Sequence, residues 1–266
     1  MHLDAVADAS CVPLPVEPRS APSLSAFLDD MRPDWHSQWA WDHYADTITA
    51  LSRRFGLRRL CEIGAGRDPL FTRAQLDALD VELTLNDISA TELARAPAGF
   101  STLLLDIAGR MDGVEGERFD LMFSRMVFEN VADVRQAWAN IHALLAPGGV
   151  ALAFVPMLYA LPFLVNHLMP NRLSGALLKA VFPERADDGD DPKFPTRYDW
   201  CRGSERRMVP MLHGLGFREA KVLPFWGHGY FQRLPGLREA DAAFNRLAAR
   251  RNWRDVTTYA YVLARK

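Results

Sequence analysis

The chain has 266 residues, of which 49% are hydrophobic and 24% are charged, and its formal net charge is -2. The near-neutral charge argues against a dedicated nucleic-acid binder, which would carry a basic face, and the length suits one large core with an added segment. Three widely spaced cysteines, Cys11, Cys61 and Cys201, indicate neither a disulfide framework nor a metal site.

The N-terminal part of the chain divides into a tail and a helical region. Residues 1–21 are predicted to be a disordered tail, because they are rich in alanine and proline and contain no lysine or arginine before Arg19. A secretory signal would begin with basic residues, so we expect a cytoplasmic protein. Between residues 22 and 56, aromatic and aliphatic residues recur at helical spacing, and Gly56 follows as a cap. We expect these helices to form a lid.

From residue 57 onward, short apolar runs alternate with amphipathic stretches. Strands are expected at 58–64, 81–87, 101–107, 118–124, 150–155, 218–225 and 257–266, and helices at 73–80, 89–96, 131–146, 204–217 and 235–250. This alternation predicts crossover units and a doubly wound α/β sheet with helices on both faces. Between 156 and 203, proline and aromatic residues interrupt the rhythm, so we expect an insertion with helical pieces.

The stretch from 150 to 169 is about as long and apolar as a membrane span. Pro156 and Pro162 interrupt it, and its first residues follow the turn 147–149, which opens a buried strand better than a helix. We therefore predict no transmembrane segment. Contact of residues 158–169 with a membrane surface is left open as an alternative.

The segment LRRLCEIGAGRDPLF places a glycine turn, Gly64–Ala65–Gly66, at the end of the first expected strand. Glycines there let the backbone approach a ligand closely, and the next helix presents its N-terminus to that ligand. A dinucleotide-binding turn would continue to a third glycine, but this chain continues with Arg67, Asp68 and Pro69. The turn therefore suits a ligand without a pyrophosphate group, and an NAD-dependent dehydrogenase is the disfavoured alternative.

Acidic residues lie near the carboxyl ends of the first three expected strands. Asp87 follows Gly66 by about 20 residues, where a carboxylate accepts the ribose hydroxyls of a nucleoside. Asp106 is placed to meet an adenine amino group, and Glu62 to hold a cationic or amino group. The alternative for each aspartate is a cap of the following turn or helix. Taken together, the acids fit S-adenosylmethionine, which has an adenosyl group and an ammonium but no phosphate.

Five segments resemble, in order and spacing, the successive motifs of class I S-adenosylmethionine-dependent methyltransferases over about residues 57–155. They are LCEIGAGRDPL, LTLNDIS, LLLDIA, FDLMFSRMVFENVADV and LLAPGGVALAF. The resemblance implies a Rossmann-like seven-stranded sheet, mostly parallel with the last strand antiparallel, in a domain over 57–266 that carries an insertion at about 156–203. It implies a cofactor site made of Glu62, Gly64, Ala65, Gly66, Asp87, Ile88, Asp106, Ile107, Ser124 and Arg125.

Within that set the resemblance implies a role for each group. Glu62 and the glycine turn would line the methionine and ribose end of the cofactor, and Ile88 would lie against the adenine. Ser124 and Arg125 would lie under the sulfonium, where the fourth strand ends.

One departure from the family concerns proton transfer. Many relatives have a Glu-His pair where this chain has Glu129 and Asn130, so a base carried on that histidine is absent. His228 and His167 are the candidate bases that the sequence offers instead, because histidine exchanges protons near neutral pH. A structural role is the alternative for each.

These patterns predict an enzyme that transfers a methyl group from S-adenosylmethionine to oxygen or nitrogen of a small, largely apolar organic acceptor, as in secondary-metabolite biosynthesis. Aromatic residues in 22–56 and 156–203 are expected to meet near the carboxyl ends of the strands, with core packing as the alternative. Two other functions stay open. One is methylation of a lipid-linked or glycan substrate at a membrane surface, and the other is a catalytically inactive binding subunit.

Overall fold

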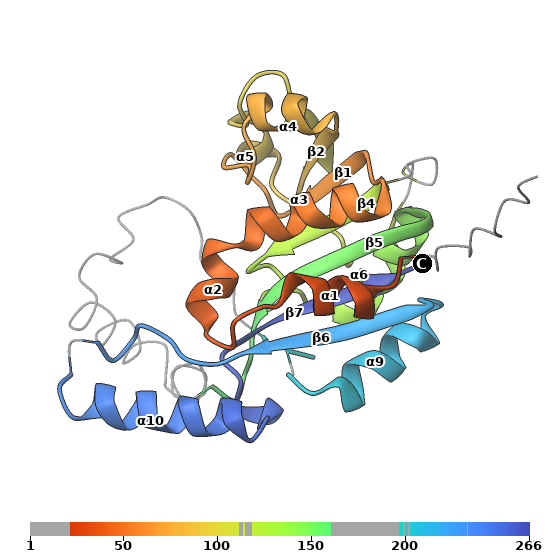
Figure 1. Cartoon of the computed structure of the whole chain (residues 1–266). Coiled ribbons are helices and arrows are strands. Elements are labelled where there is room, and N and C mark those ends of the chain that lie inside the picture. The colour runs from red at the N-terminus through yellow and green to blue at the C-terminus, as the bar shows by residue number, and fades with distance from the viewer. Residues whose placement is uncertain are drawn as a thin grey trace, which may run out of the picture.

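The computed structural model describes residues 22–111, 114, 119–160, 197–198, 200–201, 203–232 and 234–266. One seven-stranded sheet has the strand order β3-β2-β1-β4-β5-β7-β6 (Figure 1). The strands are β1 (Arg59–Ile63), β2 (Glu82–Asp87), β3 (Ser101–Leu104), β4 (Phe119–Arg125), β5 (Leu145–Pro156), β6 (Glu219–Phe225) and β7 (Tyr259–Arg265). β1 to β5 pair in parallel, and β7 is antiparallel to both β5 and β6. The predicted Rossmann-like sheet with an antiparallel last strand is confirmed.

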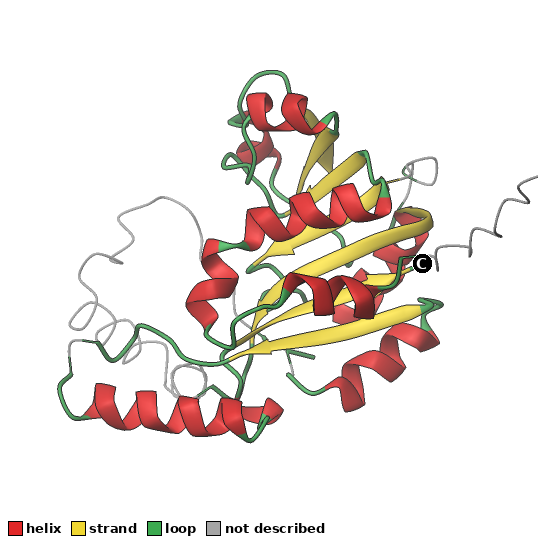
Figure 2. Cartoon of the chain, in the orientation of Figure 1, coloured by secondary structure: helices red, strands yellow, loops and turns green. Residues whose placement is uncertain are grey.

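Helices cover both faces of this sheet (Figure 2). They are α1 (Leu24–Met31), α2 (Ser37–Asp42), α3 (Tyr44–Phe55), α4 (Arg73–Leu79), α5 (Ala90–Ala94), α6 (Val134–Leu144), α9 (Glu205–Gly214), α10 (Leu237–Arg250) and the 3-10 helix η2 (Arg254–Val256). Buried residues form two apolar clusters. The first includes side chains of α1, α3, α4 and α5, and the second includes those of α6 and α9. The sheet is therefore the middle layer of three.

Local signals explain where several helices begin and end. Thr72 and Gln75 form a reciprocal capping box at the start of α4, which satisfies two backbone N–H groups of its first turn. Gly56 ends α3 as predicted, with a φ of 67° that glycine adopts without strain.

The third strand ends earlier than the sequence predicts. β3 stops at Leu104, so Asp106 lies beyond the strand rather than at its last position. The backbone N–H of Leu105 donates to the carbonyl of Asp87 at 3.1 Å, and the Asp106 carboxylate accepts from the N–H of Ala108 at 2.9 Å. Asp106 therefore caps a turn that follows the strand, because its short carboxylate reaches the backbone two residues ahead.

The apolar stretch that raised the question of a membrane span begins as a strand. Residues 150–156 belong to β5, which pairs with β4 on one side and β7 on the other. No helix within the described residues is long and apolar enough to cross a membrane. The rest of the stretch from 161, and most of the expected insertion, lie outside the described residues, as does the expected tail 1–21.

The N-terminal helices α1 and α3 pack on the face of the sheet that also carries α4 and α5, and not only at the carboxyl edge of the sheet (Figure 1). At the start of α1, the N–H of Leu24 donates to the Glu219 carboxylate at 2.8 Å, which ties α1 to the beginning of β6. α2 and the start of α3 reach the carboxyl ends of the strands, and there Trp41 of α2 contacts the rings of Phe154 and Tyr259. A lid role therefore stays a prediction, and it applies best to α2.

Tyr44, the first residue of α3, joins the helical layer to the centre of the sheet. Its buried hydroxyl donates to the carbonyl of Ser124 at 2.7 Å, and its ring packs against Phe123, Phe154 and Tyr261. Burial is the main reason that the pKa of Tyr44 is raised well above its usual value, so the hydroxyl stays a donor.

We expect Tyr44→Phe to keep the ring packing but to leave the buried carbonyl of Ser124 without its donor. Such a loss costs about 1–3 kcal/mol of unfolding free energy. Denaturant unfolding of the variant measures it. The matched control is Tyr230→Phe, since Tyr230 lies outside this ring cluster, and equal unfolding free energies for Tyr44→Phe and wild type would contradict the prediction.

Candidate functional site

The carboxyl ends of four parallel strands align at one edge of the sheet. At the end of β1, Ile63 lies opposite Asn86 of β2 and opposite Ser124 of β4. The last residue of β2, Asp87, lies opposite Leu104 of β3. The residues that follow these positions therefore share one edge, which is where open α/β sheets bind ligands.

The glycine turn after β1 has the backbone shape that its sequence requires. Gly64 and Gly66 have φ values of 69° and 52°, in the region that favours glycine. A Cβ at Gly64 would lie 2.5 Å from Val127 Cγ2, so any larger residue would clash with the segment that follows β4. A Cβ at Gly66 would lie 3.4 Å from the Asp87 carboxylate. The turn thus packs directly against the ends of β2 and β4.

Arg67, which directly follows the glycine turn, has a structural partner. Its guanidinium makes two bonds to the Glu92 carboxylate, at 2.8 and 3.1 Å. Glu92 belongs to α5, the helix after β2, so this bidentate pair ties the glycine turn to the next crossover unit. The sequence reasoning missed this role, since nothing in the spacing of the two residues indicates the contact.

Asn86 is a buried residue that connects three segments of the site. Its side-chain amide donates to the carbonyls of Leu103 and Leu105, at 3.0 and 2.9 Å, across the end of β3. Its backbone carbonyl accepts from the N–H of Ala65 in the glycine turn at 3.0 Å. Asn86 was not predicted as a site residue. Its position beside the last residue of β2 was the only signal in the sequence.

Glu62, the fourth residue of β1, is a buried acid at this edge. One oxygen of its carboxylate accepts from the N–H of Leu70 at 2.9 Å. Burial raises its pKa to about 7, against the opposing influence of the Leu70 hydrogen bond and the positive charge of Arg125. The negative form would be stabilised by a cationic group placed beside it, which is the role that the sequence predicts for Glu62.

The predicted adenosine residues lie at the ends of β2 and β3. Asp87 uses one oxygen to accept from the N–H of Ser89 at 2.8 Å, which starts the turn into α5. Ile88, next to it, is 54% exposed, which is unusual for a large apolar side chain and leaves a flat surface for a ring. Ile107, by contrast, is buried in the second apolar cluster, and its backbone carbonyl accepts from the Asn140 amide of α6 at 2.9 Å.

The end of β4 brings a buried hydroxyl and an exposed cation to the same edge. Ser124 is buried, and its Oγ has no hydrogen-bond partner among the described residues. Arg125 follows and is exposed at the end of the strand. Next to it, Met126 has a φ of 56°, a conformation that costs free energy for a residue with a side chain and that turns the chain toward Val127 and the glycine turn.

Glu129 is a buried acid that the sequence analysis did not name as a candidate site residue. Its side chain is buried, and its Oε2 has no hydrogen-bond partner within the described part of the chain. Its backbone carbonyl accepts from the N–H groups of Arg197 and Tyr198, at 2.7 and 3.1 Å. Burial raises the pKa of the carboxyl to about 7. A buried acid with a free oxygen and a pKa near neutrality can exchange a proton with a bound ligand.

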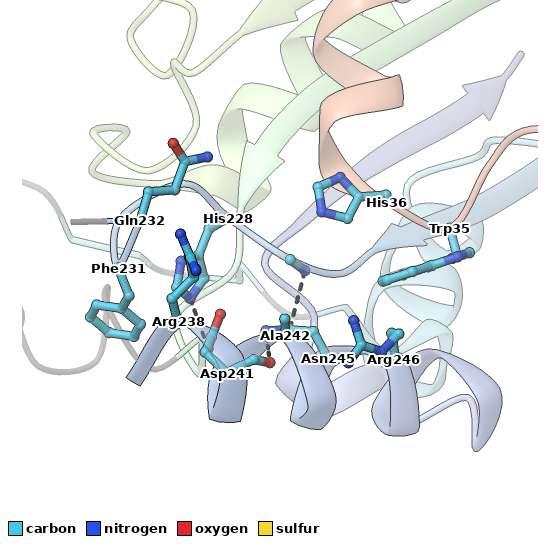
Figure 3. A pocket seen from close by; sticks show the side chains of 11 residues that line it. Trp35, His36, His228, Phe231, Gln232, Arg238, Asp241, Ala242, Asn245 and Arg246 are labelled. Carbon is cyan, nitrogen blue, oxygen red and sulfur yellow. Dashed lines mark hydrogen bonds and ion pairs between the residues drawn. The ribbon is translucent and has the colours of Figure 1, made fainter. Parts of the chain in front are cut away.

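His228, a predicted base, lies in the loop between β6 and α10 (Figure 3). Its Nε2 is 3.3 Å from the Asp241 carboxylate, and its Nδ1 accepts from the N–H of Tyr230 at 3.3 Å. Burial lowers the pKa of His228, although the carboxylate of Asp241 opposes that shift. Both ring nitrogens therefore have protein partners, and the neutral form is favoured. His167, the other predicted base, lies outside the described residues.

A cavity of about 560 Å³ lies beside His228, between α10 and the start of α2. Trp35 and His36 line one side of it, and Arg238 and Arg246 of α10 line the other (Figure 3). None of the predicted cofactor residues lines this cavity. The structure therefore separates His228 from the edge formed by β1, β2, β3 and β4, and places it at the far strand, β6.

Comparisons with known proteins agree with this architecture. Residues 61–151 match a protein family described as "Methyltransferase domain". Phosphoethanolamine N-methyltransferase 2 of Haemonchus contortus, solved with phosphomonomethylethanolamine and S-adenosylhomocysteine, has a TM-score of 0.50 at 14% identity, over 92% of this chain and 60% of that chain. A SAM-dependent methyltransferase from Archaeoglobus fulgidus has a TM-score of 0.49 at 14% identity, over 91% and 99%. Such low identities concern the fold alone, and curated protein sequences contain no match.

The buried carboxyl of Glu129 has a consequence for stability. Because its folded pKa of about 7 exceeds the ordinary value of 4.5, the folded state favours the protonated acid, and stability is lost as pH rises from about 5 to 8. Glu129→Gln removes this titration. We expect the unfolding free energy of the variant, relative to wild type, to rise by about 2 kcal/mol over that range.

Denaturant unfolding at several pH values measures this difference. Glu82→Gln is the matched control, because Glu82 is exposed at the start of β2 and its replacement should leave the pH dependence as in wild type. Parallel curves for Glu129→Gln and wild type would contradict the prediction.

Proposed function

We propose that the protein is a class I S-adenosylmethionine-dependent methyltransferase and that it methylates an oxygen or nitrogen atom of a small, largely apolar organic acceptor. The match of residues 61–151 to a methyltransferase domain supports this proposal. The observation that carries the proposal is the convergence of Glu62, the glycine turn and Asp87 at one edge of the sheet. A cavity of about 350 Å³, lined in part by Tyr159 just after β5, has the size of small-molecule sites, about 300–1,000 Å³.

The residues at this edge fit S-adenosylmethionine group by group. The buried carboxylate of Glu62 would neutralise the ammonium, and its pKa of about 7 would fall as it did so. Asp87 has a second oxygen with which to accept ribose hydroxyls, since only one is used by Ser89. The exposed side chain of Ile88 would cover one face of the adenine. When bound, S-adenosylmethionine supplies a methyl group activated by the sulfonium.

The chain's own contribution to the reaction is alignment and removal of a proton. Holding an acceptor in line with the activated carbon is worth several kcal/mol, up to about 7–11 in well-oriented intramolecular reactions. A hydroxyl acceptor must also lose its proton as its bond to carbon forms, and an ammonium acceptor must lose one beforehand, because only the free amine has a lone pair. We assign that proton to Glu129, whose buried Oε2 has no other partner among the described residues. His228 is the weaker candidate, because both of its nitrogens are engaged.

Methylation of a small acceptor is favoured over an inactive binding subunit. A lipid-linked or glycan substrate, which residues 158–169 would hold at a membrane surface, stays the alternative, since most of these residues lie outside the described part of the chain. An inactive binding subunit has no need for buried acids such as Glu62 and Glu129, whose burial costs free energy. Transfer of radiolabelled methyl from the cofactor into the small-molecule, lipid or protein fraction of a cell extract separates the three.

We expect calorimetry to show binding of S-adenosylmethionine and S-adenosylhomocysteine but not of NAD. Asp87→Asn keeps the oxygen that accepts from Ser89 but replaces the other acceptor by an amide N–H group. It should weaken cofactor binding by about 1–3 kcal/mol. The control is Asp77→Asn, since Asp77 is an exposed residue of α4 paired with Arg73. Tight NAD binding with no response to the adenosyl compounds would overturn the proposal.

Cofactor affinity should depend on pH through Glu62. Below its pKa of about 7 the carboxyl is protonated, so binding an ammonium requires release of a proton. We therefore expect affinity for S-adenosylhomocysteine to fall up to about tenfold per pH unit below 7. Calorimetry in buffers of different ionisation enthalpy counts the released protons. Glu62→Gln should bind more weakly and without this dependence, and an equally steep dependence in that variant would contradict the assignment.

A further inference from the structure

A second cavity, of about 350 Å³, lies along the other flank of α10 from the cavity of Figure 3. Asp241, Asn245 and His228 line both cavities and form the wall between them. Tyr159, just after β5, and Thr258, just before β7, close the second cavity on the side of the sheet. We call it the α10–β5 cavity.

The α10 side of this cavity is an apolar stripe. Leu237, Ala240 and Phe244 line it at positions three and four residues apart, which places them on one flank of the helix. Leu237 and Phe244 are each more than 40% exposed, which is unusual for side chains of their size. Covering such side chains with a ligand is favourable by roughly 25 cal/mol per Å² of apolar surface removed from water. The stripe thus favours an apolar occupant.

The polar groups in the wall satisfy one another. His228 and Asp241 pair at 3.3 Å. The amide of Asn245 accepts from the N–H of Gly227 at 3.1 Å and donates to the carbonyl of Asp241 at 2.9 Å. The polar groups of the wall are therefore engaged with one another, whereas Arg246 of α10 brings a positive charge to the Figure 3 cavity. An uncharged occupant is favoured, because a charged one would lose its hydration without gaining a partner.

The α10–β5 cavity opens at the carboxyl edge of the sheet. Tyr159 follows the carboxyl end of β5, so the cavity is at the same edge of the sheet as the ends of β1 and β4. Its other lining residues belong to α10, to the loop after β6 and to the segment before β7, which places it on the β6 side of β5. Because β5 is the neighbour of β4, an acceptor held in the cavity would have to extend past Tyr159 and across the end of β5 to reach the end of β4.

We propose that the α10–β5 cavity binds the uncharged, ring-containing part of the methyl acceptor, with Leu237, Ala240 and Phe244 determining which acceptors fit. This inference rests on the proposed function and adds to it a location and a chemical class for the acceptor. The atom to be methylated lies at the end of the acceptor that faces β4. The cavity of Figure 3, which Arg238 and Arg246 line, is not part of this proposed acceptor site.

The test uses N-phenyl-1-naphthylamine, an uncharged aromatic probe whose fluorescence rises in apolar surroundings. Wild-type protein should bind it, and Ala240→Trp, which fills the cavity, should weaken binding at least about tenfold. Ala243→Trp is the matched control, because Ala243 is an exposed residue of the same helix that lines neither cavity. Arg246→Gln changes a residue that lines the Figure 3 cavity but not the α10–β5 cavity, so it should leave probe binding unchanged.

Two further measurements show whether a change in probe binding comes from the α10–β5 cavity itself. Phe244→Ala removes part of the apolar wall without filling the cavity, and it should also weaken probe binding. The affinity for S-adenosylhomocysteine, measured separately by calorimetry, should be the same in all variants, so loss of the cofactor site would be seen apart from loss of the cavity. The inference is overturned if wild type does not bind the probe, or if Ala240→Trp binds it as well as Ala243→Trp does.

Discussion

Asn86 holds together the three segments on which the site depends. Its amide bonds to the carbonyls of Leu103 and Leu105 fix the end of β3 against β2, and its own carbonyl fixes the glycine turn through the N–H of Ala65. Parallel strands separate beyond the last backbone hydrogen bonds that pair them. Bonds such as those of Asn86 therefore hold the residues at the strand ends in fixed positions relative to one another. Asp87, the next residue, therefore lies within reach of Gly66. A buried amide whose N–H groups bond to two carbonyls is a rigid support of this kind.

The electrostatics of the edge follow from burial. Glu62 and Glu129 are buried acids associated with the ends of neighbouring strands, and each has a pKa raised to about 7. A shift of this size costs the ionised form about 3 kcal/mol per group, which the fold must supply from its packing. Such a cost in stability is retained where the function requires a carboxyl group that titrates near neutral pH. The two acids have different environments: Glu62 has a backbone donor and Arg125 nearby, whereas the free oxygen of Glu129 has no partner among the described residues.

The alternation of apolar runs was enough to predict the sheet, because each buried strand and amphipathic helix leaves a periodic pattern. The positions of Gly64, Gly66 and Asp87 were predictable for the same reason, since each lies at a strand end that the pattern defines. The pair Arg67–Glu92 and the burial of Glu129 were not predictable. Both depend on which distant segments meet, and a single sequence does not encode that as a local pattern. The partners of His228 are a further case, since Asp241 comes from a helix that begins nine residues later.

The central claim is that the edge built around Asn86 receives an adenosyl ligand with an ammonium group. A crystal structure of the protein with S-adenosylhomocysteine tests it most directly. The account predicts the ribose hydroxyls at the carboxylate of Asp87, the adenine against Ile88 and the amino group on the side of Glu62. A ligand bound instead in the cavity of Figure 3, or with its ribose away from Asp87, would contradict the account.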